Sequence, residues 1–259
     1  MMKGRTRVLL GGVIAALVLA GIYTGQVWLE SRAAAMPEIA RHTVTPANGS
    51  TMRIANPSGP IVVLGASYAG GWPIDRIAGI EVVNKGVSGQ TSFEVLERFE
   101  RDVAALNPRA VILWGFINDI FRADDVNPAS QRARDSYTRM IALARERGIE
   151  PILATEVTIR PPASWMNTLA AIVGALRGKE SYQARINRHV IDVDRWLVDL
   201  ARREGLLLLD FQSTLAERGG MRRAEFTQED GSHITVAGYE ALTTYARPIL
   251  EAHLARSAS

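Results

Sequence analysis

The sequence predicts an α/β protein whose parallel sheet is covered by helices on both faces. Five short apolar runs are typical of strands that are buried on both sides of a sheet. Helical stretches separate them, so that strand and helix alternate along the chain, as the crossovers of a parallel sheet require. The composition of the 259 residues, 47% apolar and 22% charged, is that of a globular protein.

Each element has its own signal. The strands are expected at residues 61–64, 80–83, 110–114, 151–155 and 206–209. Thr91 and Glu94 form a capping-box pattern, which predicts a helix with Phe93, Leu96, Phe99 and Val103 on one face. Two further helices are expected at 130–147 and 181–203. Thr235 is expected to cap a last helix that runs to Leu254.

Composition and charge exclude several classes of protein. The chain has no cysteine, which excludes disulfides, thiolate metal sites and a cysteine nucleophile. The net charge of +3 comes from the first 35 residues, and the remainder carries equal numbers of acidic and basic side chains. We therefore expect no nucleic-acid partner. No Gly-x-Gly-x-x-Gly follows a strand, so no dinucleotide site is expected.

The N-terminal region predicts export. Residues 8–29 carry no charge and follow three basic side chains. As a helix they would extend roughly 33 Å, enough for a hydrocarbon core of ~30 Å. Two interpretations of 1–29 stay open: an uncleaved membrane anchor, or a signal peptide cleaved near Ala33–Ala35. Residues 30–60 are expected to be a tether and 61–259 the globular domain, located outside the cytoplasmic membrane.

Polar and glycine residues follow the predicted strands at equivalent positions. Ser67 follows the first strand, Gly86 the second and Asn118 the third, and His233 precedes the last helix. In open parallel sheets ligands bind beyond the carboxyl ends of the strands. These residues are therefore expected to share one site.

The motifs around them resemble those of the SGNH (GDSL-type) hydrolases. The resemblance covers 61–254 and is carried by Gly-Ala-Ser at 65–67, Asn-Lys-Gly-Val-Ser-Gly-Gln-Thr at 84–91, Gly-Phe-Ile-Asn-Asp at 115–119 and Asp-Gly-Ser-His at 230–233. It implies a flavodoxin-like three-layer α/β/α domain that hydrolyses esters or thioesters, with no metal and no cofactor. Ser67 would be the nucleophile, His233 the base and Asp230 its partner, while Ser67, Gly86 and Asn118 would form the oxyanion hole.

The chemistry of these residue types agrees with that role. A serine hydroxyl is a poor nucleophile until an adjacent base takes its proton, and an imidazole serves as that base when a carboxylate fixes its tautomer. Asp230 lies three residues before His233 and can reach its ring. Loss of one oxyanion donor typically costs about 3–4 kcal/mol of transition-state stabilisation.

Two positions depart from the family pattern. Ala66 stands where the family usually has an aspartate that holds neighbouring loops. Gly115 and Asn118 are separated by two residues, whereas the family usually has one, which changes the expected aim of the Asn118 amide.

Several alternatives remain open. The same catalytic residues could transfer an acyl group to an envelope polysaccharide, and the fold could serve a non-catalytic binding protein. Gly65–Ala69 is a near miss to the nucleophile elbow of α/β-hydrolases, but there the acid usually lies far upstream of the histidine. The uncharged segment 161–176 is expected to be either a lid or acyl-binding wall above the site, or a helix that packs on the sheet. The expected partners are a small-molecule or glycan ester and, through the N-terminal helix, the membrane.

Overall fold

The computed structural model describes residues 44, 53–161 and 180–256. The predicted leader 1–29, most of the tether 30–60 and nearly all of the segment 161–176 lie outside the described residues. Within the described ranges, no helix combines the length and the apolar character that a membrane span requires.

The protein is a mixed α/β fold built on a mainly parallel sheet. Among the strands that the structure describes, the order is β2-β3-β1-β4-β5-β6, in which β2 (Arg76–Ile77) pairs antiparallel with β3 and the other neighbours pair in parallel. The five parallel strands appear in the order second, first, third, fourth, fifth, which is that of flavodoxin-like sheets. All five predicted strands are confirmed, as β1 (Ile61–Gly65), β3 (Ile80–Gly86), β4 (Ala110–Trp114), β5 (Glu150–Ala154) and β6 (Leu207–Leu209). The short β2 (Arg76–Ile77) was not expected.

The register brings the loops after three strands together. Gly65, the last residue of β1, lies opposite Gly86 at the end of β3 and opposite Trp114 at the end of β4. Every residue of β1 and β4 is buried. The chain therefore leaves the core at three adjacent points of one sheet edge.

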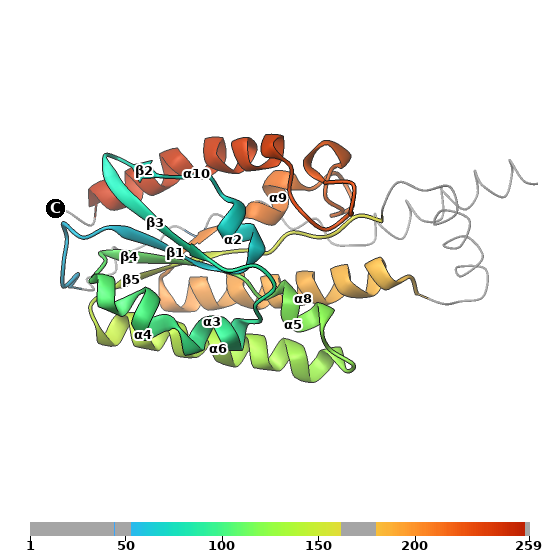
Figure 1. The fold of residues 1–259 in the computed structure, drawn as a ribbon, viewed down its shortest axis with the longest axis horizontal. Helices are drawn as coiled ribbons and strands as arrows, with labels where there is room; N and C mark the ends of the chain where they lie inside the picture. Colours follow the sequence, from blue (N-terminus) through green and yellow to red (C-terminus); the bar gives the residue numbers. More distant parts are fainter. Residues whose placement is uncertain (1–43, 45–52, 162–179, 257–259) are drawn as a thin grey trace, which may run out of the picture.

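Helices cover both faces of the sheet (Figure 1). One face carries α9 (Phe211–Leu215) and α10 (Val236–Arg256). The other carries α3 (Ser92–Glu97), α4 (Phe99–Asp102), α6 (Val126–Glu146) and α8 (Tyr182–Glu204). Two one-turn helices, α2 (Ser67–Gly71) and α5 (Ile117–Phe121), begin just after β1 and β4. Two 3₁₀ turns, Ala104–Leu106 and Ala224–Phe226, complete the described elements.

Capping side chains set the helix boundaries. The capping box of Thr91 and Glu94 is confirmed at the start of α3. Ser181 caps α8, and the Thr235 hydroxyl accepts the Gly238 N–H in the first turn of α10. Helix α6 begins four residues earlier than expected because Asp125 caps it and the first turn of a helix tolerates a proline.

The predicted helix after Thr91 is wrong in one respect. It is broken at Arg98 into α3 and α4. Phe93, expected on the core face, is 54% exposed, whereas Phe99 and Val103 are buried. The break turns Arg98 inward, where its side chain is 4% exposed.

An aromatic cluster supports α2 from below. The ring of Trp114 lies with its centroid 5.9 Å from that of Tyr68, 6.0 Å from Trp72 and 4.7 Å from Phe211. The Trp72 indole also donates a 2.9 Å hydrogen bond to the Thr243 hydroxyl on α10. Packing and hydrogen bonding together hold α2 against both the sheet and the last long helix.

Candidate active site

Ser67 begins α2 immediately after β1. Its side chain is partly exposed, between the buried Ala66 and Tyr68. The first N–H groups of a helix have no acceptor within the helix, so the turn does not consume the Ser67 N–H. The residue therefore presents a hydroxyl and an N–H at the same edge of the sheet.

The loop that carries Asp230 and His233 is closed by its own hydrogen bonds. Thr227 and Ile234 form an antiparallel bridge, and the Gln228 N–H donates to the His233 carbonyl at 2.9 Å. The carboxylate of Asp230 hydrogen-bonds to His233 Nδ1 and accepts the His233 N–H at 2.9 Å. This pairing leaves Nε2 as the free nitrogen of the imidazole.

The hydrogen bonds to Asp230 change its acidity. Partial burial raises the pKa of this carboxyl, but the hydrogen bonds from the His233 ring and from the His233 and Ser232 amides outweigh it. The net effect holds the pKa of Asp230 well below its usual range. Asp230 is thus a carboxylate at any pH where an imidazole is neutral, as the orienting member of a triad must be.

A second set of contacts ties this loop to α2. The Tyr68 hydroxyl donates a 2.6 Å hydrogen bond to the Ser232 carbonyl, and its ring meets the His233 ring edge-on at 6.5 Å. Arg222, which is fully buried, donates to the same carbonyl at 2.5 Å and lies over the Tyr68 ring. Because Tyr68 follows Ser67 directly, these contacts bring the serine and the histidine segments side by side.

Gly86 has a packing role and a partner for its N–H. A Cβ atom at this position would lie 2.0 Å from the Gly70 nitrogen, so only glycine lets β3 approach α2 so closely. The Gly86 N–H donates to the Asn84 side chain at 2.9 Å, and Asn84 in turn donates to the Ala69 carbonyl at 2.7 Å. A role for Gly86 in an oxyanion hole therefore requires this hydrogen to be shared with Asn84.

Asn118 lies on α5 and its amide is held in place. The Nδ2 atom donates to the Gln90 carbonyl at 2.9 Å, which uses one of its two hydrogens. The adjacent Asp119 carboxylate accepts the N–H and the hydroxyl of Ser92 at 2.7 and 2.8 Å. The longer spacing after Gly115 thus leaves Asn118 next to the loop that follows β3.

Two buried carboxyl groups at the start of α5, those of Glu156 and Asp194, were missed by the sequence analysis. Glu156 accepts the Phe116 N–H at 2.7 Å and the Ile117 N–H at 3.3 Å. The Glu156 N–H donates to Asp194 at 2.9 Å. Burial raises the pKa of Glu156 to about 7 and raises that of Asp194 well above its usual value. The sequence signal that could have pointed to Glu156 is a glutamate directly after the predicted buried strand 151–155.

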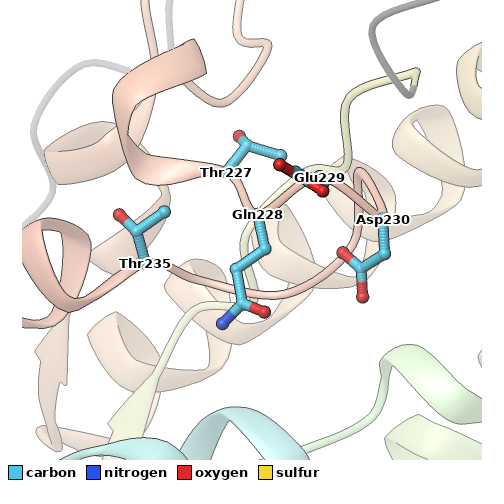
Figure 2. A pocket seen from close by; sticks show the side chains of 5 residues that line it. All are labelled: Thr227, Gln228, Glu229, Asp230 and Thr235. Carbon is cyan, nitrogen blue, oxygen red and sulfur yellow. The ribbon is translucent and has the colours of Figure 1, made fainter.

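The surface beside Asp230 and His233 carries a polar hollow. Thr227, Gln228, Glu229, Asp230 and Thr235 line it, all from the segment that bears His233 (Figure 2). In the parts of the chain that the structure describes, no three His, Asp or Glu side chains are arranged to hold a metal ion.

The fold and the site define a class of enzyme, and similarity to known proteins identifies the family. A serine at the end of the first strand and a histidine–aspartate pair before the last helix are the arrangement of an α/β serine hydrolase. Residues 64–241 match the model of the GDSL-like lipase/acylhydrolase family. Since this is more than half of the chain, the protein belongs to that family of ester hydrolases.

Individual relatives are distant. Over 82 residues the chain is 30% identical to an uncharacterized lipoprotein, YqeF, of Bacillus subtilis (strain 168). This match covers 31% of the chain and about a third (34%) of that relative's length.

Solved structures share the fold. A GDSL-like lipase of Bacteroides thetaiotaomicron is similar with a TM-score of 0.59 at 18% identity, over 77% of this chain and 91% of that one. A lipase/acylhydrolase of Enterococcus faecalis is similar with a TM-score of 0.54 at 22% identity, over 75% of this chain and 96% of that one. At such identities the similarity concerns the fold alone.

Proposed function

We propose that this protein hydrolyses carboxylic esters through an acyl-enzyme on Ser67, outside the cytoplasmic membrane. One observation carries the proposal. The Tyr68–Ser232 hydrogen bond joins the neighbours of Ser67 and His233, while Asp230 holds the ring of His233 by Nδ1. The base and the group that orients it are thus hydrogen-bonded to each other, and a further hydrogen bond joins their loop to the residue next to the nucleophile.

The reaction follows from these roles. His233 Nε2 takes the Ser67 proton while Ser67 Oγ attacks the acyl carbon. The electrons of the carbonyl π bond move to its oxygen, which becomes the oxyanion. The C–O bond to the alcohol then breaks, and the imidazolium returns the proton to the leaving oxygen. Water, activated by the same imidazole, hydrolyses the acyl-enzyme and releases the acid with Ser67 restored.

The oxyanion is assigned to donors of three loops. The Ser67 N–H and the second hydrogen of the Asn118 amide are the main donors, because neither is consumed by the contacts described above. Gly86 contributes by sharing its N–H with Asn84. Glu156 supports the group indirectly, since it binds the two N–H groups that precede Asn118.

The location and the substrate class are part of the proposal. The uncharged segment 8–29 behind three basic residues supports export with a membrane anchor or a signal peptide. The name of the Bacillus subtilis relative, a lipoprotein, is consistent with an envelope location. The substrate is a small-molecule or glycan ester, cleaved without a metal or other cofactor.

A fluorophosphonate probe tests the proposal. The full-length protein is treated with the probe and its intact mass is measured, with Ser67→Ala and Ser88→Ala in parallel. Ser88 is an exposed serine of the loop after β3 and serves as the matched control. We expect a single adduct on the wild type and on Ser88→Ala, none on Ser67→Ala, and hydrolysis of p-nitrophenyl acetate that follows the same pattern. A folded wild type without an adduct, or with one that persists in Ser67→Ala, contradicts the proposal.

A further inference from the structure

We propose that Arg98 is a positioning residue of this hydrolysis, because its buried guanidinium fixes the three loops that carry the oxyanion donors. The inference rests on the proposed function, since it assigns Arg98 a task in stabilising that oxyanion. It concerns a residue outside all four motifs, located where the predicted helix after Thr91 breaks.

Arg98 binds the ends of two adjacent strands directly. One terminal nitrogen donates to the Gly65 carbonyl at 2.7 Å, two residues before Ser67. The other donates to the Lys85 carbonyl at 2.7 Å, one residue before Gly86. The planar guanidinium therefore sets the spacing between the loops after β1 and β3.

The third loop is reached through Gln90. Arg98 Nε donates to the Gln90 side-chain oxygen at 2.6 Å, and the main-chain oxygen of Gln90 accepts the Asn118 amide at 2.9 Å. Arg98 thus acts on Asn118 through one intervening residue. Ala66, between Gly65 and Ser67, has no polar side-chain atom that could hydrogen-bond to these loops.

The charge of Arg98 is compensated inside the protein. The Asp102 carboxylate accepts at 2.8 Å from the same Arg98 nitrogen that binds the Lys85 carbonyl. Hydrogen bonds from Arg101 and Arg98 outweigh the effect of partial burial and lower the pKa of Asp102. Because four donors point to four acceptors in a fixed plane, a lysine with its single ammonium cannot reproduce the arrangement.

The first test compares two equally buried arginines. Arg98→Lys is expected to lower kcat by about tenfold to a hundredfold with KM changed less than about threefold, because a displacement near 1 Å at the donors can cost 10²-fold. As whole residues Arg98 and Arg109 are each 5% exposed, but Arg109 precedes β4 at the opposite edge of the sheet. Within the described residues, its side chain donates a single long bond of 3.4 Å, to the Leu254 carbonyl. Arg109→Lys is expected to keep the wild-type kcat although it lowers the melting temperature.

A double-mutant cycle separates positioning from general destabilisation. If Arg98 acts by aiming Asn118, Arg98→Lys costs much less in an Asn118→Ala background than in the wild type. Gln90→Ala, a milder change in the same path, is expected to lower kcat in the same direction and covers the case that Arg98→Lys does not fold.

The outcomes are distinct. An unlabelled Ser67 in the wild type overturns the proposed function, and the Arg98 assignment with it. A labelled, active wild type with an unchanged kcat in Arg98→Lys, or in Gln90→Ala if the lysine variant is unfolded, overturns the Arg98 assignment alone. Effects of Arg98→Lys and Asn118→Ala that simply multiply overturn the part of the assignment that reaches Asn118 through Gln90. The Arg98 assignment is supported if the effects of Arg98→Lys and Asn118→Ala on kcat are coupled and Arg109→Lys keeps the wild-type kcat.

Discussion

The Tyr68 hydroxyl donates a 2.6 Å hydrogen bond to the main-chain oxygen of Ser232. Each residue is the immediate neighbour of a proposed catalytic residue, Tyr68 of Ser67 and Ser232 of His233. Desolvation by complete burial raises the pKa of Tyr68 well above its usual value, so the phenol remains a donor throughout the physiological range. The bond therefore aligns two segments that are far apart in the chain.

Tyr68→Phe should weaken this alignment without unfolding the protein. Arg222 still binds the Ser232 carbonyl, so we expect a loss of about 1 kcal/mol of stability. We expect a fall of about tenfold in kcat, because the imidazole is less well aimed at Ser67. Steady-state kinetics and urea denaturation check both.

Thr243→Val is the control for Tyr68→Phe. It removes the hydrogen bond from Trp72 to α10, costing about 1 to 3 kcal/mol, without touching the loop of His233. Its kcat should equal that of the wild type. A Tyr68→Phe variant with the wild-type kcat would show that Arg222 alone is sufficient to hold the loop.

Gly86→Ala should damage both stability and rate. The added Cβ would lie 2.0 Å from the Gly70 nitrogen, within backbone that cannot yield like a side chain, so we expect a cost of about 3 kcal/mol. The displacement moves α2 and with it Ser67, and kcat measured well below the melting temperature should fall by at least about tenfold.

Gly205→Ala provides the comparison. Gly205 has a φ of 63° and no atom within 4 Å of the position of its Cβ, so alanine there costs only the left-handed backbone, about 1 to 2 kcal/mol. Its kcat should be unchanged. If Gly86→Ala were no worse than Gly205→Ala, the close approach of β3 to α2 would not matter for the site.

Asn118→Ala should lower kcat by ~10²-fold or more with little change in KM, because the amide acts on the oxyanion and not on the bound ester. Asn56→Ala, which removes a partly exposed amide that donates to the Asn107 carbonyl, is the matched control and should have no effect on rate. Measured kcat and KM for both variants decide the point. An unaltered rate in Asn118→Ala would mean that this amide serves only to bind Gln90.

Glu156 should make the protein less stable as pH rises. Burial raises its pKa in the folded state from 4.5 to about 7, so the folded protein binds this proton more tightly than the unfolded chain. The stability from this group is fully present below about pH 4.5 and is lost as pH rises through about 7, at most ~3 kcal/mol. Urea denaturation at pH 5 and pH 8 measures the loss.

Glu156→Gln should reduce that difference between pH 5 and pH 8. It does not abolish it, because Asp194 also has a raised pKa. Glu225→Gln, which removes a carboxylate whose side chain is 60% exposed, should keep the wild-type difference. Equal pH dependence in the wild type and in Glu156→Gln would show that Glu156 stays ionised when buried.

The sheet and the capped helices could be predicted because their signals are local. A strand buried on both faces is a short apolar run, and the capping box of Thr91 and Glu94 spans only four residues. The strand ends could therefore be located, and Ser67, Asn118 and His233 could be assigned to one edge of the sheet. The direction in which each group points is set by contacts between segments that are far apart in the chain. The Gly86 N–H is directed to Asn84, and this follows from the packing of β3 against α2.

The residues that the sequence analysis missed share one physical property. Arg98 and Glu156 have charged or titratable side chains. Such side chains are usually exposed, so a pattern of apolar and polar positions predicts that they face the solvent. Both are buried because each satisfies main-chain groups of loops, namely Gly65 and Lys85 for Arg98 and Phe116 and Ile117 for Glu156. These main-chain groups require a buried partner only after the loops have come together in the folded protein, so the sequence pattern does not show it.

The contact between Tyr68 and Ser232 joins the two ends of the domain, and this has a consequence for biosynthesis. Ser67 emerges from the ribosome well before Asp230, His233 and helix α10, which follow it by more than half of the domain. A chain that is still growing, or that ends before this segment, lacks both the proposed base and the partner of Tyr68. Ester cleavage should therefore begin only after the whole domain has been synthesised, so that the nascent enzyme cannot act on esters it meets before it is complete.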